Sequence, residues 1–225
     1  MTRIFTRGKL EYAFESLTII YIDIFPIEGV PRKRREMKFR KRLRSEIAND
    51  LPEWEGEFMS YKELKKQLKR IAPCHEESKK CGKRPRLATE GGGNLREGTG
   101  FMILLDRELE KVNAFFIGKE EEYIIIMKEL KNRVASMDCD GDTTQLKMDI
   151  LNFHREMVSL LHYSVLNFAG YIKIMKKHKK KTASFSHLPF KPTVLQQPFF
   201  ITDVICKFLK ECEAMLNQLF LVKKP

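Results

Sequence analysis

The stretch GFMILLDRELEKVNAFFIGKEEEYIIIMKELKNRV, residues 100–134, decides the fold class of this chain. Its apolar residues recur at intervals of three and four over about ten turns, which is the spacing of one face of an α-helix. The residues on this face are Phe101, Leu104, Leu105, Leu109, Val112, Phe116, Tyr123, Met127, Leu130 and Val134. The sequence therefore predicts one long helix from about 100 to 136.

A second long helical pattern follows the acidic stretch Asp138–Asp142 and runs from about 146 to 181. Three prolines between 189 and 198 mark a passage rich in turns, and Ile201–Leu221 again has amphipathic spacing. Short C-terminal helices are therefore expected within about 190–221. No segment of any length shows the two-residue alternation of a strand. The sequence predicts an all-α fold built on two long helices.

The N-terminal part of the chain predicts a helical hairpin with irregular segments on both sides. Residues 1–36 lack a sustained period and are expected to form an irregular extension. In residues 37–72 two helical patterns meet at Asn49-Asp50, and Pro52 suits the first turn of the second helix. Because the break is so short, the two helices should fold back on each other. Residues 73–99 contain prolines and three consecutive glycines without periodicity, which is typical of a mobile linker.

The positive charge of the chain is concentrated in two segments. The formal net charge is +12, from 42 Lys and Arg against 30 Asp and Glu. Residues 37–90 hold 15 basic and 9 acidic residues, and residues 173–191 hold 7 basic residues and no acidic one. Charge gathered in this way favours an anionic partner of defined shape over general binding to polyanions.

Composition also excludes several classes of protein. The longest apolar run, Leu17–Phe25, is interrupted by Asp23 and is far shorter than the roughly 20 residues of a membrane span. The five cysteines are odd in number and lack CxxC spacing, which argues against a disulfide framework or a zinc ribbon. We therefore expect no membrane insertion and a reducing compartment, either cytosol or nucleus.

Motifs for catalysis or for metal binding are missing from the sequence. Gly91–Gly93 is not followed by the Gly-Lys-Ser/Thr of a phosphate-binding loop, and the aspartates at 138, 140 and 142 do not have the spacing of a calcium loop. The five histidines are scattered without partners at metal-ligand spacing. No group of nucleophile, base and orienting residue can be assembled. The sequence therefore predicts neither an enzyme nor a metal centre.

A cluster of lysines at the end of the second long helix is the strongest candidate for a binding surface. At about 100° per residue, Lys173, Lys176, Lys177, Lys180 and Lys181 share one face, opposite an apolar arc that includes Ile172 and Met175, whereas Lys179 points toward that arc. One interpretation is a solvated face whose cations suit the C-terminal end of a helix. The other is an anion site, because like charges at this spacing repel and no acidic residue lies nearby.

A second basic edge lies on the predicted hairpin. Tyr61 and Lys65 stand one helical turn apart, on the border of the stripe formed by Leu64, Leu68 and Ile71. A phenol hydroxyl and an ammonium placed in this way could both donate to one phosphate group. The plainer alternative is a half-buried tyrosine beside an exposed lysine.

Several motifs in order along residues 37–221 resemble those of SPX domains. The motifs of the hairpin are MKF (37–39), LPEW (51–54) and YKELKK (61–66), and those of the long helices are LEKVNAFF (109–116), KEEE (119–122) and YSVLNFAGYIKIMKK (163–177). The motifs LPF (188–190), VLQQPFF (194–200) and ECEAM (211–215) are similar to the tail of small plant members that contain little besides this domain.

This resemblance implies a fold and a binding site. The fold would be an N-terminal hairpin packed on a bundle with two long helices. The ligands would be inositol polyphosphates such as inositol hexakisphosphate, and above all inositol pyrophosphates, with no further cofactor. Carried over by motif, one phosphate pocket would comprise Tyr61, Lys65 and Lys177, with Lys38 nearby. A flanking cluster would comprise Lys173, Lys176 and Lys180.

The resemblance also implies a biological role. Stand-alone plant members would hold MYB-type phosphate-starvation transcription factors away from DNA when the ligand is present, acting by sequestration and not by catalysis. Location in the nucleus and cytoplasm would follow from such a role, and the basic residues 79–86 suit a nuclear import signal. Direct contact with nucleic acid is not expected.

The chain departs from the family pattern at three places. Family members usually begin at Met-Lys-Phe, whereas 36 residues precede Met37 here. Arg40 stands where glycine is usual, and Lys179 replaces an aspartate that could orient the neighbouring lysines. Ligand affinity and selectivity are therefore expected to differ from those typical of the family.

Two other function classes compete with this interpretation. A nucleic-acid-binding protein could use Arg32–Arg35 together with Lys173–Lys181, although lysine outnumbers arginine on the decisive face, where base readout favours arginine. A fragment of an enzyme or transporter is the third possibility, because SPX domains also occur on such proteins. We expect no catalytic or transport domain after residue 221.

Overall fold

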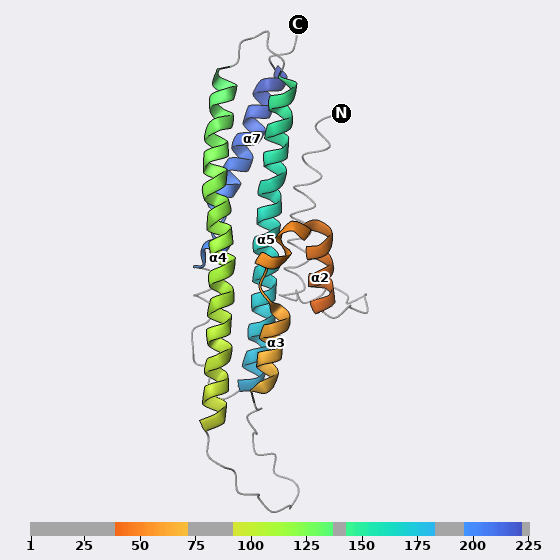
Figure 1. Ribbon diagram of the computed structural model, residues 1–225. Helices are drawn as coiled ribbons and strands as arrows, with labels where there is room; N and C mark the ends of the chain where they lie inside the picture. The colour runs from red at the N-terminus through yellow and green to blue at the C-terminus, as the bar shows by residue number, and fades with distance from the viewer. Residues whose placement is uncertain (1–38, 72–91, 137–142, 183–195, 222–225) are drawn as a thin grey trace, which may run out of the picture.

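The computed structural model describes residues 39–71, 92–136, 143–182 and 196–221, and every element in these ranges is helical (Figure 1). The all-α prediction is therefore confirmed for the described part of the chain. The expected extension 1–36, residue Lys38 and most of the expected linker lie outside these ranges. Side chains are described from Gly98 onward in the first long helix.

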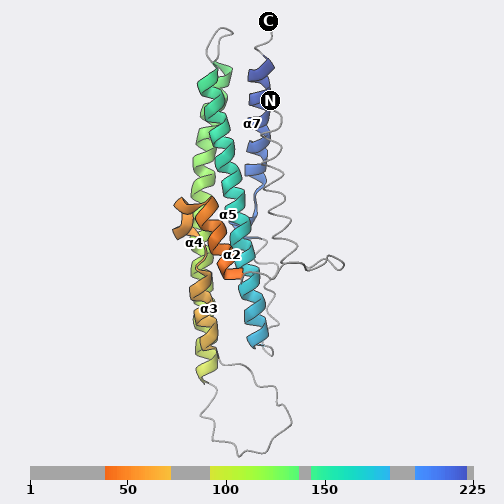
Figure 2. The same cartoon turned by 90° about the vertical axis from the view of Figure 1, so that its right-hand side faces the viewer.

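Two long helices form the axis of the molecule. Helix α4 (Gly92–Ala135) and helix α5 (Thr144–Thr182) lie side by side and run in opposite directions (Figures 1 and 2). Fully buried aromatic residues join them, including Phe116 and Tyr123 of α4 and Tyr163 of α5. The apolar stripe expected for 100–134 is confirmed, with Leu104 and Leu109 half-buried at its edge.

Helix α4 begins at Gly92 and not near Gly100, so the last part of the expected linker is helical. Gly100 lies close to helix α3, because a Cβ atom at this position would meet Nε2 of Gln67 at 3.0 Å.

Different elements cover the two halves of the long pair. Helix α7 (Asp203–Leu221) packs on α4 and α5 along the half that contains the C-terminal end of α4, with the short 3-10 helix η2 (Pro198–Phe200) before it (Figure 2). Helices α2 (Phe39–Asp50) and α3 (Tyr61–Arg70) lie on the other half. That other half contains the lysine-rich end of α5.

The expected second helix of the hairpin, residues 52–72, is divided into two parts. Pro52–Glu57 form the 3-10 helix η1, the backbone is extended at Phe58, and α3 begins only at Tyr61. Phe58 and Met59 are buried, and the backbone N–H groups of Met59 and Ser60 donate to side chains of α5 and α4. These contacts replace the hydrogen bonds of a continuous helix.

Helices α2 and α3 run in opposite directions, as a hairpin requires (Figure 1). They meet where the ring of Phe39 packs edge-on against the ring of Tyr61, with centroids 5.2 Å apart. Both helices also pack on α5, and Leu43 of α2 lies close to Gly170 of α5, where a Cβ atom would meet its side chain at 4.0 Å. Helix α3 packs on both long helices, which therefore determine its position more than α2 does.

Candidate functional site

The lysine face at the end of α5 is accessible. Lys176, Lys177 and Lys180 are exposed, and Lys173 is half-buried. They occupy the last turns of α5, where cations are favoured by the partial negative charge of a helix C-terminus. Each ammonium can donate three hydrogen bonds and accept none, so the face presents donors for an anion.

Lys179 is also exposed, which contradicts its expected position toward the apolar arc. The buried residues at this end of α5 are Tyr171 and Ile174, whereas Ile172 and Met175 are half-buried. The buried arc is narrower here than expected, because α7 covers the other half of the long pair. The exposed lysine surface is correspondingly wider.

His178, which lies within the lysine run, does not add to this positive charge at neutral pH. Its ring stacks on Phe101 of α4, with centroids 4.7 Å apart and planes 10° apart. Burial lowers the pKa of His178 below the ordinary histidine value. The ring therefore packs α5 against α4 and stays neutral beside the lysines.

The position predicted for Tyr61 is wrong. Its side chain is 4% exposed and belongs to the core, not to the border of the stripe, because its ring packs against Phe39 of the preceding helix. Burial raises the pKa of the Tyr61 hydroxyl, which keeps it protonated as a donor. Lys65, one turn further along α3, is half-buried.

The candidate residues come from two neighbouring helices, α3 and α5. The two helices pack together and run in the same direction (Figures 1 and 2). Nζ of Lys181 bonds to the carbonyl oxygen of Lys69, a separation of 112 residues. Counted back one and two turns from this contact, α3 carries Lys65 and Tyr61, and α5 carries Lys177 and Lys173. Lys38 lies outside the described residues.

An aromatic contact ties helix α2 to this surface. Nζ of Lys173 lies 5.6 Å from the ring centroid of Phe39, within the range of a cation–π interaction. Phe39 in turn contacts Tyr61. The sequence gives no sign of this contact, because it joins residues far apart in the chain.

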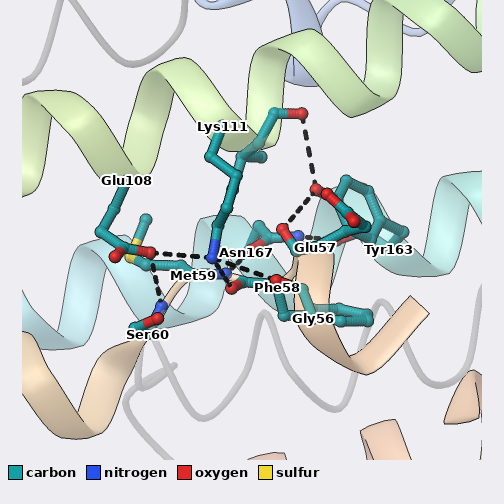
Figure 3. Close-up of polar contacts among 10 residues, drawn as sticks. Gly56, Glu57, Phe58, Met59, Ser60, Glu108, Lys111, Tyr163 and Asn167 are labelled. Carbon is teal, nitrogen blue, oxygen red and sulfur yellow. Dashed lines mark hydrogen bonds and ion pairs between the residues drawn. The ribbon is translucent and has the colours of Figure 1, made fainter.

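A polar network fixes the N-terminal end of α3 (Figure 3). The N–H of Met59 donates to Oδ1 of Asn167 at 2.9 Å, and the N–H of Ser60 donates to Oε2 of Glu108 at 2.9 Å. Lys111 pairs with Glu108 at 3.1 Å and donates to the carbonyl of Phe58 at 2.7 Å. Side chains of α4 and α5 thus hold the segment that leads into α3.

Two further groups in this network are buried. The hydroxyl of Tyr163 donates to the carbonyl of Glu57 at 2.9 Å, and burial raises the pKa of Tyr163. Nδ2 of Asn167 donates to the carbonyl of Tyr163 at 2.9 Å. Sequence reasoning missed this network, because its residue types are also common on exposed helix faces.

Lys181 differs from the other lysines of the run. Its Nζ donates to the carbonyls of Lys69 and Ile71, at 3.0 and 2.6 Å. The helical wheel placed it on the basic face near 80°, close to the position of the buried Ile174 near 100°. The proximity to a buried position is the one signal that could have identified this inward contact.

The described residues offer no sign of a metal site or a membrane span. Within them, no group of three or more His, Cys, Asp or Glu side chains is placed to hold a metal ion. None of the described helices is both long enough and apolar enough to cross a bilayer.

Comparison with known proteins identifies the relatives of this chain. A family profile for the SPX domain matches residues 37–99. SPX domain-containing proteins 2 and 1 of Arabidopsis thaliana are each 47% identical to it, over 191 and 185 residues, 82% of this chain and 66% and 72% of their own lengths. SPX domain-containing protein 1 of Oryza sativa subsp. indica is 47% identical over 193 residues, 81% of this chain and 65% of its own length. The chain thus spans about two thirds of the length of these relatives.

A solved structure has the same fold. It is the SPX domain of Chaetomium thermophilum glycerophosphodiester phosphodiesterase 1 in complex with inositol hexakisphosphate, with a TM-score of 0.62 and 28% sequence identity. The match covers 82% of this chain and 99% of the fungal one. The family profile, the plant relatives and this helical neighbour agree, and the chain belongs to the SPX domain family.

Proposed function

We propose that this chain binds inositol polyphosphates, and inositol pyrophosphates in preference, on the surface formed by α3 and the last turns of α5. The observation that carries the proposal is the parallel packing of α3, which carries Lys65, on α5, which carries Lys177 and the exposed Lys176 and Lys180. Ammonium groups on two adjacent helices suit a compact ring with several phosphates, because each phosphate can accept several charge-assisted hydrogen bonds.

Within the proposed site, Tyr61, Lys65 and Lys177 form one phosphate pocket, and Lys173, Lys176 and Lys180 flank it. The ring of Tyr61 is buried, so its contribution would come from the protonated hydroxyl. Lys173 already contacts Phe39, so an anion bound there would also affect α2. Lys38 precedes α2 directly and is proposed as an additional donor.

The biological output we propose is sequestration of a MYB-type phosphate-starvation transcription factor, in the nucleus and cytoplasm, without catalysis. Like charges on α3 and α5 repel each other, and a bound polyanion would remove that repulsion and tighten the packing of the hairpin. If the transcription factor recognises the tightened hairpin, ligand and partner must raise each other's affinity by the same factor.

Parallel calorimetric titrations of the full chain test the binding proposal. The ligands are inositol hexakisphosphate, an inositol pyrophosphate, inorganic phosphate and a duplex DNA at the same salt concentration. We expect both inositol compounds to bind far more tightly than inorganic phosphate. Tighter binding of duplex DNA, with a steep salt dependence that is independent of sequence, would favour the nucleic-acid alternative instead.

A charge-matched pair of variants tests the location of the site. Lys177→Ala should weaken binding of inositol hexakisphosphate by about tenfold to a hundredfold, the value of one charge-assisted hydrogen bond. Lys128→Ala removes the same charge from an exposed position on the half of α4 covered by α7, and should change affinity little. Equal affinities of the two folded variants would exclude Lys177 from the site.

Co-purification tests the output. The partner is a MYB-type phosphate-starvation transcription factor, with and without saturating inositol pyrophosphate. The transcription factor should be retained on this chain only when the ligand is present. Equal retention in both conditions would contradict ligand-dependent sequestration even if the small molecule binds.

A further inference from the structure

A lysine side chain of helix α5 binds the C-terminal end of helix α3. The last carbonyls of an α-helix have no partner within the helix and carry its partial negative charge. Two carbonyls at the end of α3, those of Lys69 and Ile71, accept from Nζ of Lys181 at 3.0 and 2.6 Å. Lys181 is half-buried and belongs to the last turn of α5.

A carboxylate of helix α4 lies at the opposite, N-terminal end of α3. Ser60 precedes the helix and makes no side-chain capping bond, but its N–H donates to the carboxylate of Glu108 on α4. A negative group at the N-terminus and a positive group at the C-terminus are the arrangement that a helix dipole favours. Side chains of α4 and α5 therefore hold α3 at both ends.

These end contacts act against electrostatic repulsion. Helix α3 carries five basic residues and one acidic residue, and it packs beside the six lysines of 173–181. Its buried contacts come from a short stripe that includes Leu64 and Leu68. Repulsion from α5 would move α3 outward, and Lys181 is a cation of that same run whose hydrogen bonds pull α3 inward.

We infer that Lys181 is a positioning residue of the polyphosphate site. Its ammonium binds the end of α3, not the ligand, and so sets the distance between Lys65 and Lys177. This inference rests on the proposed function for its effect on ligand affinity. The hold on α3 itself is a property of the ligand-free protein and can be measured without any ligand.

Two substitutions that remove the same charge separate positioning from direct contact. Lys181→Met has an apolar side chain of similar length and donates no hydrogen bond, whereas Lys181→Gln keeps an N–H donor on a slightly shorter chain. Lys180→Met removes a charge from an exposed neighbour that the proposed site places in contact with the ligand. Lys179→Met removes one from an exposed residue outside that site.

The first measurement is backbone hydrogen exchange in the full chain without ligand. In Lys181→Met, amides of residues 65–71 should exchange about two- to tenfold faster, the range that one net hydrogen bond allows. Lys181→Gln should retain part of the protection. Lys180→Met and Lys179→Met should exchange like the original chain at these residues. Unchanged exchange in Lys181→Met would overturn the inference.

The second measurement is calorimetry with inositol hexakisphosphate. Variants in which α3 is better protected from hydrogen exchange should bind the ligand more tightly. Lys181→Gln should therefore bind inositol hexakisphosphate more tightly than Lys181→Met, although both lack the charge. Lys180→Met should lose affinity without losing protection, and Lys179→Met should change least.

Two outcomes of the calorimetry would contradict the positioning role. Lost affinity in Lys181→Met with normal protection would make Lys181 a ligand contact, and lost protection with unchanged affinity would make it structural alone. If the original chain itself fails to bind inositol hexakisphosphate, the proposed function fails, while the exchange result still decides whether Lys181 holds α3.

Discussion

Glu108 shows how one buried carboxylate can stay charged in a helical core. Burial alone would raise its pKa, but hydrogen bonds from Ser60 and Lys111 outweigh burial and hold the pKa below the ordinary value. Glu108 therefore loses stabilising contacts if it becomes protonated. Because its pKa in the folded state is lower than in the unfolded state, its contribution to stability is present at neutral pH and disappears as the pH falls.

We predict that Glu108→Gln removes this pH dependence. At pH 7 the variant should be less stable than the original chain, because an amide cannot form the ion pair with Lys111. The difference should shrink as the pH falls below the ordinary glutamate pKa of 4.5 and toward the lower pKa of the folded state. Urea unfolding at several pH values, followed by fluorescence of the single tryptophan, Trp54, measures both curves.

Burial also lowers the pKa of buried histidines such as His154. Comparing the free energies of unfolding of the two proteins at each pH cancels this contribution. Those histidines destabilise both proteins equally on acidification. A difference in stability that stays constant from pH 7 to below pH 4.5 would show that the charge of Glu108 does not contribute.

The long helices were predictable from the sequence, whereas the details of the hairpin were not. Periodicity over many turns determines α4 and α5, because every apolar position supports the same face. Residues 52–72 also show a helical stripe, but side chains distant in the chain, Glu108 and Asn167, bind the backbone at 59–60 and break the helix there. Local pattern cannot reveal such contacts.

For the candidate site, too, the sequence predicts some features and not others. Exposure of Lys176, Lys177 and Lys180 follows from the helical wheel of α5 alone. The burial of Tyr61 and the inward contact of Lys181 depend on how α2 and α3 pack, which the wheel of one helix does not contain. The ligand roles of these residues stay predictions.

Helix α4 contains a glycine whose replacement should stabilise it. Gly118 lies in the helix interior and is exposed, and a Cβ atom there would meet nothing within 4 Å. Glycine in such a position costs about 1 kcal/mol relative to alanine. Gly118→Ala should therefore raise the free energy of unfolding by about that amount. Affinity for inositol hexakisphosphate should stay the same.

Urea unfolding and calorimetry of Gly118→Ala provide the check. Gly56 lies outside the α-helices and is a matched control, because a Cβ atom there also meets nothing within 4 Å. Gly56→Ala should lack the helix-propensity gain. A loss of stability in Gly118→Ala would mean that this face of α4 has a close neighbour in solution.

The two halves of the long pair have different stabilising contacts. One half is covered by α7, whose buried residues Ile205 and Cys212 are fully enclosed. The other half carries α2 and α3, and brings the basic residues of α3 beside the lysines of α5. Because the lysine run of α5 and the basic residues of α3 lie on the second half, a polyanion should act mainly on that half.

We predict that inositol hexakisphosphate stabilises the protein locally. At about a hundred times Kd, mass action adds about 2.7 kcal/mol to the free energy of unfolding. Hydrogen exchange should slow in α2, in α3 and at the end of α5, and should change little in α7. Replacing Lys173, Lys176 and Lys180 together by Ala should abolish the ligand-induced shift. Thermal unfolding with and without ligand measures both effects, with Lys128→Ala as the control for lost charge. A triple variant that still gains the full shift, or protection spread equally over α7, would contradict a site on the α3–α5 surface.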